Sequence, residues 1–318
     1  MNAVFLDFGT LAADELDTAP LCDPLPGLRC FDHSPAATVS ARLADAEVAF
    51  INKVRLDADT FAASPQLRYV GLAATGSDNV DLDAARRAGV TVTNIRGYCT
   101  QSVVEYVVGT LITLAHGINH YRDDVRQGRW QTARQFCLLD HPLRELSAMT
   151  LGIVGHGVLG QAVADAARSF GMRVLIAERP RAQRCREGRV PFDEMLEQVD
   201  ALTLHCPLTP DTQHLLGVNE LSRMKPNVLI VNTARGGLID STALVSALAS
   251  GRVAGAAVDV LDHEPPVNGD PLLDYEGRNL ILTPHIAWAS ATARQNAINQ
   301  LGTNLQAWLG GQPVNQLA

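Results

Sequence analysis

The sequence predicts an α/β protein of two domains, a Rossmann dinucleotide-binding domain and a flavodoxin-like domain. Short apolar runs alternate with helix-like segments through both halves of the chain, which is the pattern of parallel sheets covered by helices. A glycine-rich turn follows one of these runs, as it does in a Rossmann domain. The chain has 318 residues, 47% of them hydrophobic, which is enough for two domains with buried cores.

The first domain is expected to contain four buried parallel strands, because its apolar runs have strand length and are separated by helix-like segments. These runs cover residues 3–7, 48–51, 67–73 and 90–94. An alanine-rich segment at 81–88 predicts a helix that ends before Gly89, since glycine commonly follows the last helical residue. This alternation favours a flavodoxin-like domain.

An apolar segment with helical spacing at 102–116 predicts a long helix that links the two domains. From Thr150 a second alternating series begins. Its predicted strands are 150–154, 173–177, 201–205, 228–232, 253–259 and 280–283, and its predicted helices are 158–170, 192–197 and 240–249. A final helix at 290–309 is expected to return to the first domain. The predicted domains are therefore 1–98 with 290–318, the flavodoxin-like domain, and 99–289, the Rossmann domain.

A predicted strand leads directly into a GxGxxG turn that opens a helix, which is the context that a dinucleotide site requires. Gly155 permits the tight turn, Gly157 lets the backbone approach a pyrophosphate, and Gly160 lets the helix pack against the strand. Together with Val158 and Leu159, these glycines are predicted to bind the phosphates at the helix N-terminus, where free N–H groups favour anions.

Glu178 ends the next predicted strand, roughly 20 residues after the glycines. A carboxylate there can accept hydrogen bonds from the adenosine ribose and repels a 2′-phosphate, so the sequence favours NAD over NADP. Arg179, Arg181 and Arg184 follow directly, and an arginine after this strand could instead bind a 2′-phosphate. NAD is therefore the predicted cofactor, with NADP as the less favoured alternative.

Three segments that follow predicted strands carry most of the polar candidate residues. They are Asn-Thr-Ala-Arg-Gly-Gly at 232–237, Asp-Val-Leu-Asp-His-Glu-Pro-Pro at 259–266 and Thr-Pro-His-Ile-Ala at 283–287. In an open parallel sheet, ligands bind beyond the carboxyl ends of the strands. The reacting groups are therefore expected among these segments.

Together these motifs resemble the D-isomer-specific 2-hydroxyacid dehydrogenases, and most of all their glycerate dehydrogenase, or hydroxypyruvate reductase, branch. The similarity extends over nearly the whole chain. Besides the glycine turn and the three strand-end segments, it includes segments 74–81, 97–100 and 205–209. The segments at 136–146 and 285–290 favour the glycerate branch.

The resemblance implies a catalytic set of Arg235, Glu264 and His285. Arg235 would bind the substrate carboxylate and polarise the C2 oxygen, which a guanidinium can do with bidentate geometry and a permanent charge. His285 would protonate the C2 oxygen as hydride arrives, and Glu264 would hydrogen-bond His285 and favour its imidazolium form. Backbone N–H groups around Thr75 and Gly76 would bind the substrate carboxylate from the other domain.

The resemblance also implies which residues line the cofactor. Asp259 would hold the nicotinamide carboxamide, and Cys206 is interpreted as a lining residue rather than a nucleophile, because no base is evident near it. The other expected cofactor contacts are Thr75, His205, Pro207, Thr212, Thr233, Ala234, Arg235, His285 and Ala287. Since Arg235 would supply the electrophilic charge, no metal is expected.

The expected reaction is NADH-dependent reduction of hydroxypyruvate or glyoxylate to the D-2-hydroxy acid, and the reverse oxidation of D-glycerate. Phosphoglycerate dehydrogenase and D-lactate-type dehydrogenase remain alternatives. From a different class, NAD-dependent corepressors that bind partner proteins also resemble this family, but long disordered flanks like theirs are not evident here. The resemblance further implies a homodimer that uses the helix at 102–116.

Composition argues against several other classes. The net charge of −8 argues against nucleic-acid binding, which needs a basic surface. We expect neither a secretory signal nor a membrane span, because the first residues lack a basic segment before an apolar one and no window approaches about 18 uncharged apolar residues. Six cysteines without CxxC spacing predict reduced thiols in a cytoplasmic protein.

Overall fold

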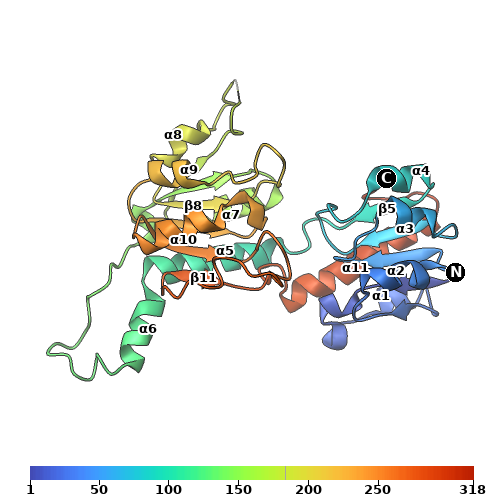
Figure 1. Ribbon diagram of the computed structural model, residues 1–318, viewed down its shortest axis with the longest axis horizontal. Helices are drawn as coiled ribbons and strands as arrows, with labels where there is room; N and C mark the ends of the chain where they lie inside the picture. Colours follow the sequence, from blue (N-terminus) through green and yellow to red (C-terminus); the bar gives the residue numbers. More distant parts are fainter. Residues whose placement is uncertain (183) are drawn as a thin grey trace. The chain divides into compact units, whose positions relative to one another are not determined.

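The computed structural model describes residues 1–182 and 184–318 (Figure 1). The chain divides into two compact units, the first of Met1–Cys99 with Ala289–Ala318 and the second of Thr100–Trp288. Each unit is built around its own parallel sheet, so the α/β fold class predicted from the sequence is confirmed.

The first unit has five parallel strands in the order β2-β1-β3-β4-β5, which is the strand order of flavodoxin. The strands are β1 (Ala3–Phe5), β2 (Arg29–Cys30), β3 (Val48–Ile51), β4 (Tyr69–Leu72) and β5 (Thr91–Asn94). The helices are α1 (Ala19–Cys22), α2 (Ala36–Leu43), α3 (Ala58–Ala62), α4 (Leu82–Arg87) and α11 (Ala291–Leu309). Strands β1, β3 and β4 are buried along their whole length, which is why they appear in the sequence as uninterrupted apolar runs.

Helix α11 comes from the end of the chain and packs within the first unit. Its cap is Ser290, whose hydroxyl accepts a hydrogen bond from the backbone N–H of Ala293 at 3.2 Å. Farther along, the Trp308 ring lies 4.9 Å from the Tyr69 ring of β4. The buried Asn304 side chain donates to the carbonyl of Asn94, at the end of β5, over 2.8 Å.

The second unit has six parallel strands in the order β11-β10-β9-β8-β6-β7. They are β6 (Thr150–Val154), β7 (Arg173–Ile176), β8 (Ala201–Leu204), β9 (Val228–Asn232), β10 (Val253–Val258) and β11 (Leu280–Leu282). The helices are α5 (Thr100–Ala115), α6 (Ile118–Arg126), α7 (Val158–Ser169), α8 (Phe192–Leu196), α9 (Val218–Arg223) and α10 (Ser241–Ala249).

The third strand of a Rossmann sheet is reduced here to a single residue. Val190 forms a parallel bridge with Ala177, next to the end of β7. It donates to the carbonyl of Ile176 at 2.9 Å and accepts from the N–H of Glu178 at 2.7 Å. With Val190 in the place of that strand, the sheet follows the Rossmann order 3-2-1-4-5-6, and β11 adds one strand at the edge.

The sequence predicted no element between residues 117 and 149, where the structure has α6 and an extended segment that protrudes from the second unit (Figure 1). We call residues 118–145 the arm. Ile118, Tyr121 and Val125 recur at helical spacing in α6, but Asp124 is its only buried residue, so this apolar face does not belong to the core. The Asp124 carboxylate instead holds the arm together, because it pairs with Arg129 and with His141, each at 2.8 Å.

The other differences from the predicted elements are short. Strand β2 has two exposed residues, and α1, α3 and α9 have four to six residues each, too few for a periodic apolar pattern. Strand β1 ends at Phe5 rather than at residue 7, because the buried Asp7 carboxylate accepts from the N–H groups of Asn52 and Lys53 at 2.8 and 2.6 Å. Among the described residues, no helix is both long enough and apolar enough to cross a membrane.

Candidate active site

The three strand-end segments that carry the catalytic candidates lie at one edge of the sheet of the second unit. Strands β9, β10 and β11 are neighbours, and their register pairs Val258 with both Asn232 and Leu282. The three segments therefore leave the sheet at the same level. This is the edge at which open parallel sheets bind ligands.

His285 and Glu264 form a hydrogen-bonded pair at this edge. The Nδ1 atom of His285 lies 2.6 Å from Oε2 of Glu264, and the other carboxylate oxygen accepts from the N–H of Leu261 at 2.9 Å. The side chains are only 24% and 33% exposed, so the pair is partly shielded from water. With Nδ1 directed at Glu264, Nε2 is the ring nitrogen that can carry a proton to a substrate. A cavity of about 440 Å³ lies beside the pair.

Asp259 holds the loop that carries His285. Its carboxylate is buried and accepts from the hydroxyl of Thr283 at 2.5 Å and from the N–H groups of Ile286 and Ala287, each at 2.8 Å. Its carbonyl accepts from the N–H of His285 at 2.8 Å. His285 itself has φ +57°, a left-handed conformation that a non-glycine residue adopts only when the surrounding contacts fix it. The geometry gives Asp259 a loop-holding role; its predicted contact with the carboxamide stays a prediction.

Two residues of α5 support the same loop, and neither was predicted from the sequence. The Tyr106 hydroxyl lies 2.6 Å from the Thr283 hydroxyl, which extends the hydrogen-bond chain from Asp259. Ser102 donates to the carbonyl of Ala287 at 2.7 Å. No motif marks either residue, because both lie within an ordinary apolar helix pattern.

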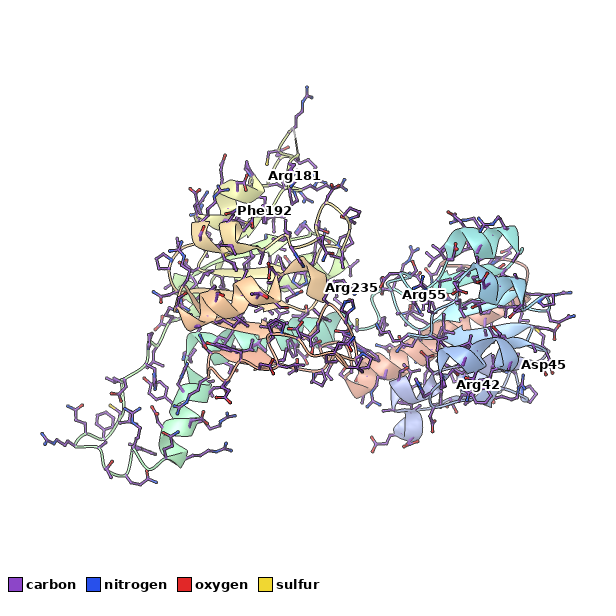
Figure 2. All side chains as sticks on the ribbon, in the orientation of Figure 1. Arg42, Asp45, Arg55, Arg181, Phe192 and Arg235 are labelled. Carbon is purple, nitrogen blue, oxygen red and sulfur yellow. The ribbon has the colours of Figure 1, made fainter. Side chains whose placement is uncertain are left out.

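Arg235 lies in the turn after β9, where Figure 2 labels it. The fully buried Asn232 fixes this turn: its amide donates to the carbonyl of Arg235 at 2.8 Å and its oxygen accepts from the N–H of Ala234 at 3.0 Å. The guanidinium donates to the carbonyl of Ala234 at 2.8 Å. Arg235 is therefore anchored at the strand end through its backbone and its side chain, beside the segment that carries Glu264.

The glycine turn has the shape that a dinucleotide requires. Gly155 has φ +93°, and a Cβ there would lie 2.5 Å from the backbone of Cys206. A Cβ on Gly160 would lie 2.0 Å from the carbonyl oxygen of Gly155, whereas a Cβ on Gly157 would meet nothing within 4 Å. Open space over Gly157, at the start of the twelve-residue helix α7, fits a pyrophosphate on the backbone N–H groups. Nearby in the sheet, the Thr233 hydroxyl is buried and has no hydrogen-bond partner among the described residues, so it is available to bind a ligand.

Gly157 and Gly160 should therefore respond differently to alanine. Gly160→Ala is expected to lower the melting temperature by several degrees, because its methyl group overlaps the turn. Gly157→Ala should melt within about 2 °C of the parent, yet bind the dinucleotide at least about tenfold more weakly, since its methyl group enters the space for phosphate. Thermal unfolding and cofactor titration of both variants make the comparison. Equal melting temperatures with equal affinities would reject this account of the turn.

The loop after β8 combines a neutral thiol with a neutral imidazole. Burial raises the pKa of Cys206 to about 11, so this thiol is not an activated nucleophile, and burial lowers the pKa of His205 to about 4. The Thr212 hydroxyl donates to the carbonyl of Pro207 at 2.8 Å and closes the loop. All four residues were predicted to line the cofactor, and the structure holds them in one loop.

Acid should destabilise the protein in a range that reflects His205. Its folded-state pKa lies below that of an unfolded histidine, so the unfolded chain binds the extra proton; stability is fully present above about pH 6.5 and falls toward pH 4. The limiting slope from one such proton is about 1.4 kcal/mol per pH unit. Burial lowers the pKa values of His120 and His156 as well, which acts in the same direction. Unfolding followed between pH 6.5 and 4.5 should show a shallower decline for His205→Asn; an unchanged slope would contradict the assignment.

Glu178 is where the sequence predicted it, at the end of β7, but its carboxylate is already engaged. It is 4% exposed and accepts from the N–H groups of Arg179 and Arg186 and from the Arg186 guanidinium. These donors hold the pKa of Glu178 well below its usual range, with the Arg186 side chain as the largest cause. No motif in the sequence marks Arg186 as the partner of this carboxylate.

Thr75 and Gly76 belong to the first unit, in the segment after β4. The Thr75 hydroxyl donates to the carbonyl of Ile95 at 2.9 Å, and the Asn94 side chain donates to the carbonyl of Thr75 at 2.7 Å. The segment is thereby tied to the end of β5, on the carboxyl side of its sheet. Their predicted contact with a substrate carboxylate stays a prediction.

Comparison with known proteins first defines the class. Residues 108–287 match the family model described as "D-isomer specific 2-hydroxyacid dehydrogenase, NAD binding domain", so the second unit contains the nicotinamide-dinucleotide-binding domain of a dehydrogenase. This match covers more than half of the chain. The chain belongs to the D-isomer-specific 2-hydroxyacid dehydrogenases, an oxidoreductase family that acts on small 2-hydroxy and 2-keto acids.

Individual relatives resemble nearly the whole chain. It is 44% identical over 274 residues to the glycerate dehydrogenase of Methylorubrum extorquens, and the aligned region covers 86% of each chain. It is 37% identical over 280 residues to the hydroxypyruvate reductase of Blautia hydrogenotrophica, which covers 87% of this chain and 86% of that one. Among solved structures, the TT0316 protein of Thermus thermophilus covers 100% of both chains with a TM-score of 0.86 at 32% identity.

Proposed function

We propose that the protein reduces hydroxypyruvate or glyoxylate to the D-2-hydroxy acid with NADH as hydride donor, and catalyses the reverse oxidation of D-glycerate. The observation that carries the proposal is the 2.6 Å contact between His285 and Glu264, a proton donor held at the edge of a dinucleotide-binding sheet. The relatives named glycerate dehydrogenase and hydroxypyruvate reductase support this substrate class.

Arg235, His285 and Glu264 have separate roles in this reaction. Arg235 binds the substrate carboxylate and polarises the C2 carbonyl, which its permanent charge allows without a metal. A bound nicotinamide dinucleotide supplies the hydride that adds to C2. The C2 oxygen takes the proton from Nε2 of His285, and Glu264 stabilises the imidazolium before that transfer. In the oxidation direction His285 takes the proton back.

Cofactor and substrate contacts are part of the same proposal. The N–H groups at the glycine turn, from Gly155 to Gly160, hold the pyrophosphate, and Thr233 supplies a hydroxyl for the bound group. The loop with Cys206 and the segment from Asp259 to Ala287 line the nicotinamide end. In the first unit, the N–H groups around Thr75 and Gly76 bind the substrate carboxylate, which makes that unit the substrate domain.

A panel of keto acids tests the proposal. With NADH at saturation, hydroxypyruvate and glyoxylate should give the highest kcat/KM, and pyruvate and larger apolar keto acids should give values at least about tenfold lower. A preference for pyruvate would favour the D-lactate-type alternative, and a preference for phosphohydroxypyruvate would favour phosphoglycerate dehydrogenase. Absence of turnover with every acid would favour the NAD-dependent protein-binding role.

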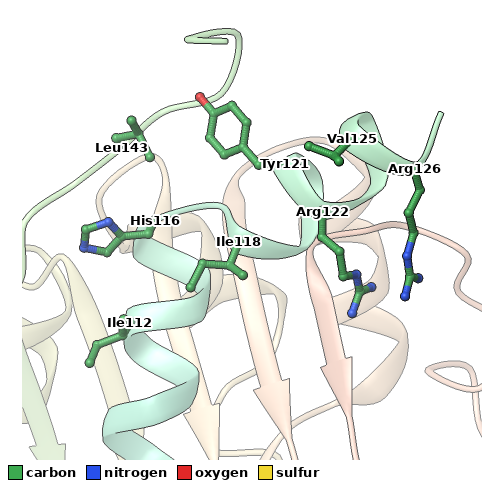
Figure 3. A pocket seen from close by; sticks show the side chains of 8 residues that line it. All are labelled: Ile112, His116, Ile118, Tyr121, Arg122, Val125, Arg126 and Leu143. Atoms are coloured by element: carbon green, nitrogen blue, oxygen red, sulfur yellow. The ribbon is translucent and has the colours of Figure 1, made fainter. Parts of the chain in front are cut away.

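We also propose that the protein is a homodimer in the cytoplasm. The arm exposes large apolar side chains, with Trp130 52%, Phe136 91% and Leu139 72% exposed. At its base, α5, α6 and Leu143 border an open pocket of about 730 Å³ lined by apolar and basic side chains (Figure 3). Large apolar side chains exposed on one protruding segment are typical of an interaction surface, and a second copy of the chain is the partner that would cover them. All six cysteines are free thiols, as a reducing compartment requires.

Light scattering after size-exclusion chromatography distinguishes the states, since a dimer has twice the 34.1 kDa of the chain. The double variant Phe136→Asp and Leu139→Asp should release monomers, because it places charges in the apolar patch. Matched aspartate substitutions at exposed positions outside the arm, Val218 and Val267, should leave the mass unchanged. A parent protein that elutes at the mass of one chain would disprove the dimer.

A further inference from the structure

The Glu178 carboxylate has no acceptor position left for a ribose. Oε1 accepts from the N–H of Arg179 at 2.7 Å and from Nη2 of Arg186, while Oε2 accepts from the N–H of Arg186 at 3.0 Å and from its Nε at 2.7 Å. Two carboxylate oxygens offer about four lone-pair sites, and four donors occupy them. A ribose could therefore bind to Glu178 only if one of these donors left.

Positive charge dominates the region around this carboxylate. The loop that follows β7 contains Arg181, which Figure 2 labels, and the chain rejoins the sheet at Val190. Beside Glu178, which is buried, the Arg186 side chain is 51% exposed. Arg189 donates to the carbonyl of Ala177 at 3.2 Å, at the end of the same strand.

The basic region extends as far as the glycine turn. Burial and then the charge of Arg189 lower the pKa of His156, a residue between the glycines of that turn. The side chains of Arg186 and Arg189 thus lie at the strand end where a Rossmann domain binds the adenosine ribose, and Arg179 follows Glu178 directly in the sequence. A dianionic phosphate group is favoured in such a field.

We propose that Arg186 binds the 2′-phosphate of NADPH, so that the enzyme accepts NADPH as well as NADH. The inference rests on the proposed function, because it takes the second unit to be the dinucleotide domain of an active dehydrogenase. Glu178 is the positioning residue in this arrangement. It holds Arg186 by the Nε–Nη2 edge, and the Nη1–Nη2 edge is the second edge with which a guanidinium binds phosphate bidentately.

Binding of cofactor fragments tests the proposal without turnover. Titration calorimetry at one fixed salt concentration compares adenosine 2′,5′-bisphosphate with 5′-AMP. The parent protein should bind the bisphosphate at least as tightly as 5′-AMP. Arg186→Gln should weaken the bisphosphate about 10- to 100-fold, the range for a lost charged hydrogen bond. Its affinity for 5′-AMP should stay the same or increase, because Glu178 becomes available to the ribose.

The controls separate a specific contact from a general loss of charge or fold. Arg223→Gln removes another exposed, ion-paired arginine of the second unit and should leave both affinities unchanged. Arg186→Lys keeps the charge without the bidentate fork and should recover part of the bisphosphate binding. If Arg186→Gln does not fold, the lysine variant still tests whether the guanidinium at position 186 binds the bisphosphate. The proposal is overturned if the parent binds 5′-AMP more than about 30-fold tighter than the bisphosphate. An equal loss of both ligands in Arg186→Gln would also overturn it.

Steady-state rates distinguish failure of this inference from failure of the proposed function. With hydroxypyruvate, the parent should show kcat/KM values for NADPH and NADH within about tenfold of each other. A protein that binds the bisphosphate through Arg186 but reduces no keto acid would support the cofactor site and reject the proposed reaction. Rapid turnover with NADH together with negligible bisphosphate binding would support the reaction and reject the role of Arg186.

Discussion

Replacing His285 with alanine is expected to lower kcat by about 10²- to 10⁴-fold, the range for loss of a general acid. Hydride addition to C2 leaves negative charge on the oxygen, and without His285 only water can supply the proton. The effect should fall on kcat more than on KM, because the proton is transferred in the transition state. Rates with hydroxypyruvate and saturating NADH provide the measurement, and turnover close to that of the parent would remove His285 from the mechanism.

Glu264→Gln alters the hydrogen-bond partner of His285 and should have a smaller effect on kcat than His285→Ala. The amide can keep a hydrogen bond to Nδ1 of His285 but removes the negative charge that stabilises the imidazolium. We expect kcat to fall by about 10- to 100-fold, less than for His285→Ala. Because the two residues act as one unit, Glu264→Gln should add little to His285→Ala in the double variant. Additive losses would indicate that Glu264 acts independently of the histidine.

The parts of the fold that could be predicted are those in which backbone geometry or burial leaves a local signal. Strands β6 and β9 have the predicted ends, because both are apolar runs bounded by polar or turn residues. The glycine turn was predictable for a steric reason, since the close approach of Gly160 to Gly155 admits no side chain. Helix α6 has Ile118, Tyr121 and Val125 at helical spacing, but the rest of this short segment is polar and its one buried residue is an aspartate, so it did not resemble a core helix.

Contacts between distant side chains could not be predicted from local patterns. Tyr106 meets Thr283 across 177 positions, and nothing in its own segment shows that it supports the loop of His285. Arg186 lies eight positions after Glu178 in a loop without a motif, yet it supplies three of the four hydrogen bonds to the carboxylate that was predicted to bind a ribose. The residue types at Glu178 and Asp259 were therefore identified, while their partners had to come from the structure.

Arg235→Ala is expected to raise KM for the keto acid and to lower kcat, so that kcat/KM falls by about 30- to 5,000-fold. This corresponds to the 2–5 kcal/mol lost when one partner of a buried charged pair is removed. Both constants change because the guanidinium contacts the carboxylate in the ground state and the C2 oxygen as negative charge develops. The backbone of Arg235 is extended, so alanine fits the turn and the melting temperature should remain close to that of the parent.

Chemical rescue separates the guanidinium from any structural role of Arg235. Added guanidinium ions should restore part of the activity of Arg235→Ala, because the cavity left by the side chain admits a small planar cation, but should not restore His285→Ala. Arg235→Lys should retain a low activity, since an ammonium keeps the charge but cannot bind a carboxylate with two parallel hydrogen bonds. Arg223→Ala removes an exposed arginine elsewhere in the second unit. Its activity should equal that of the parent, and added guanidinium should not change it. A lysine variant as active as the parent would show that charge alone suffices at this position and that bidentate binding plays no part.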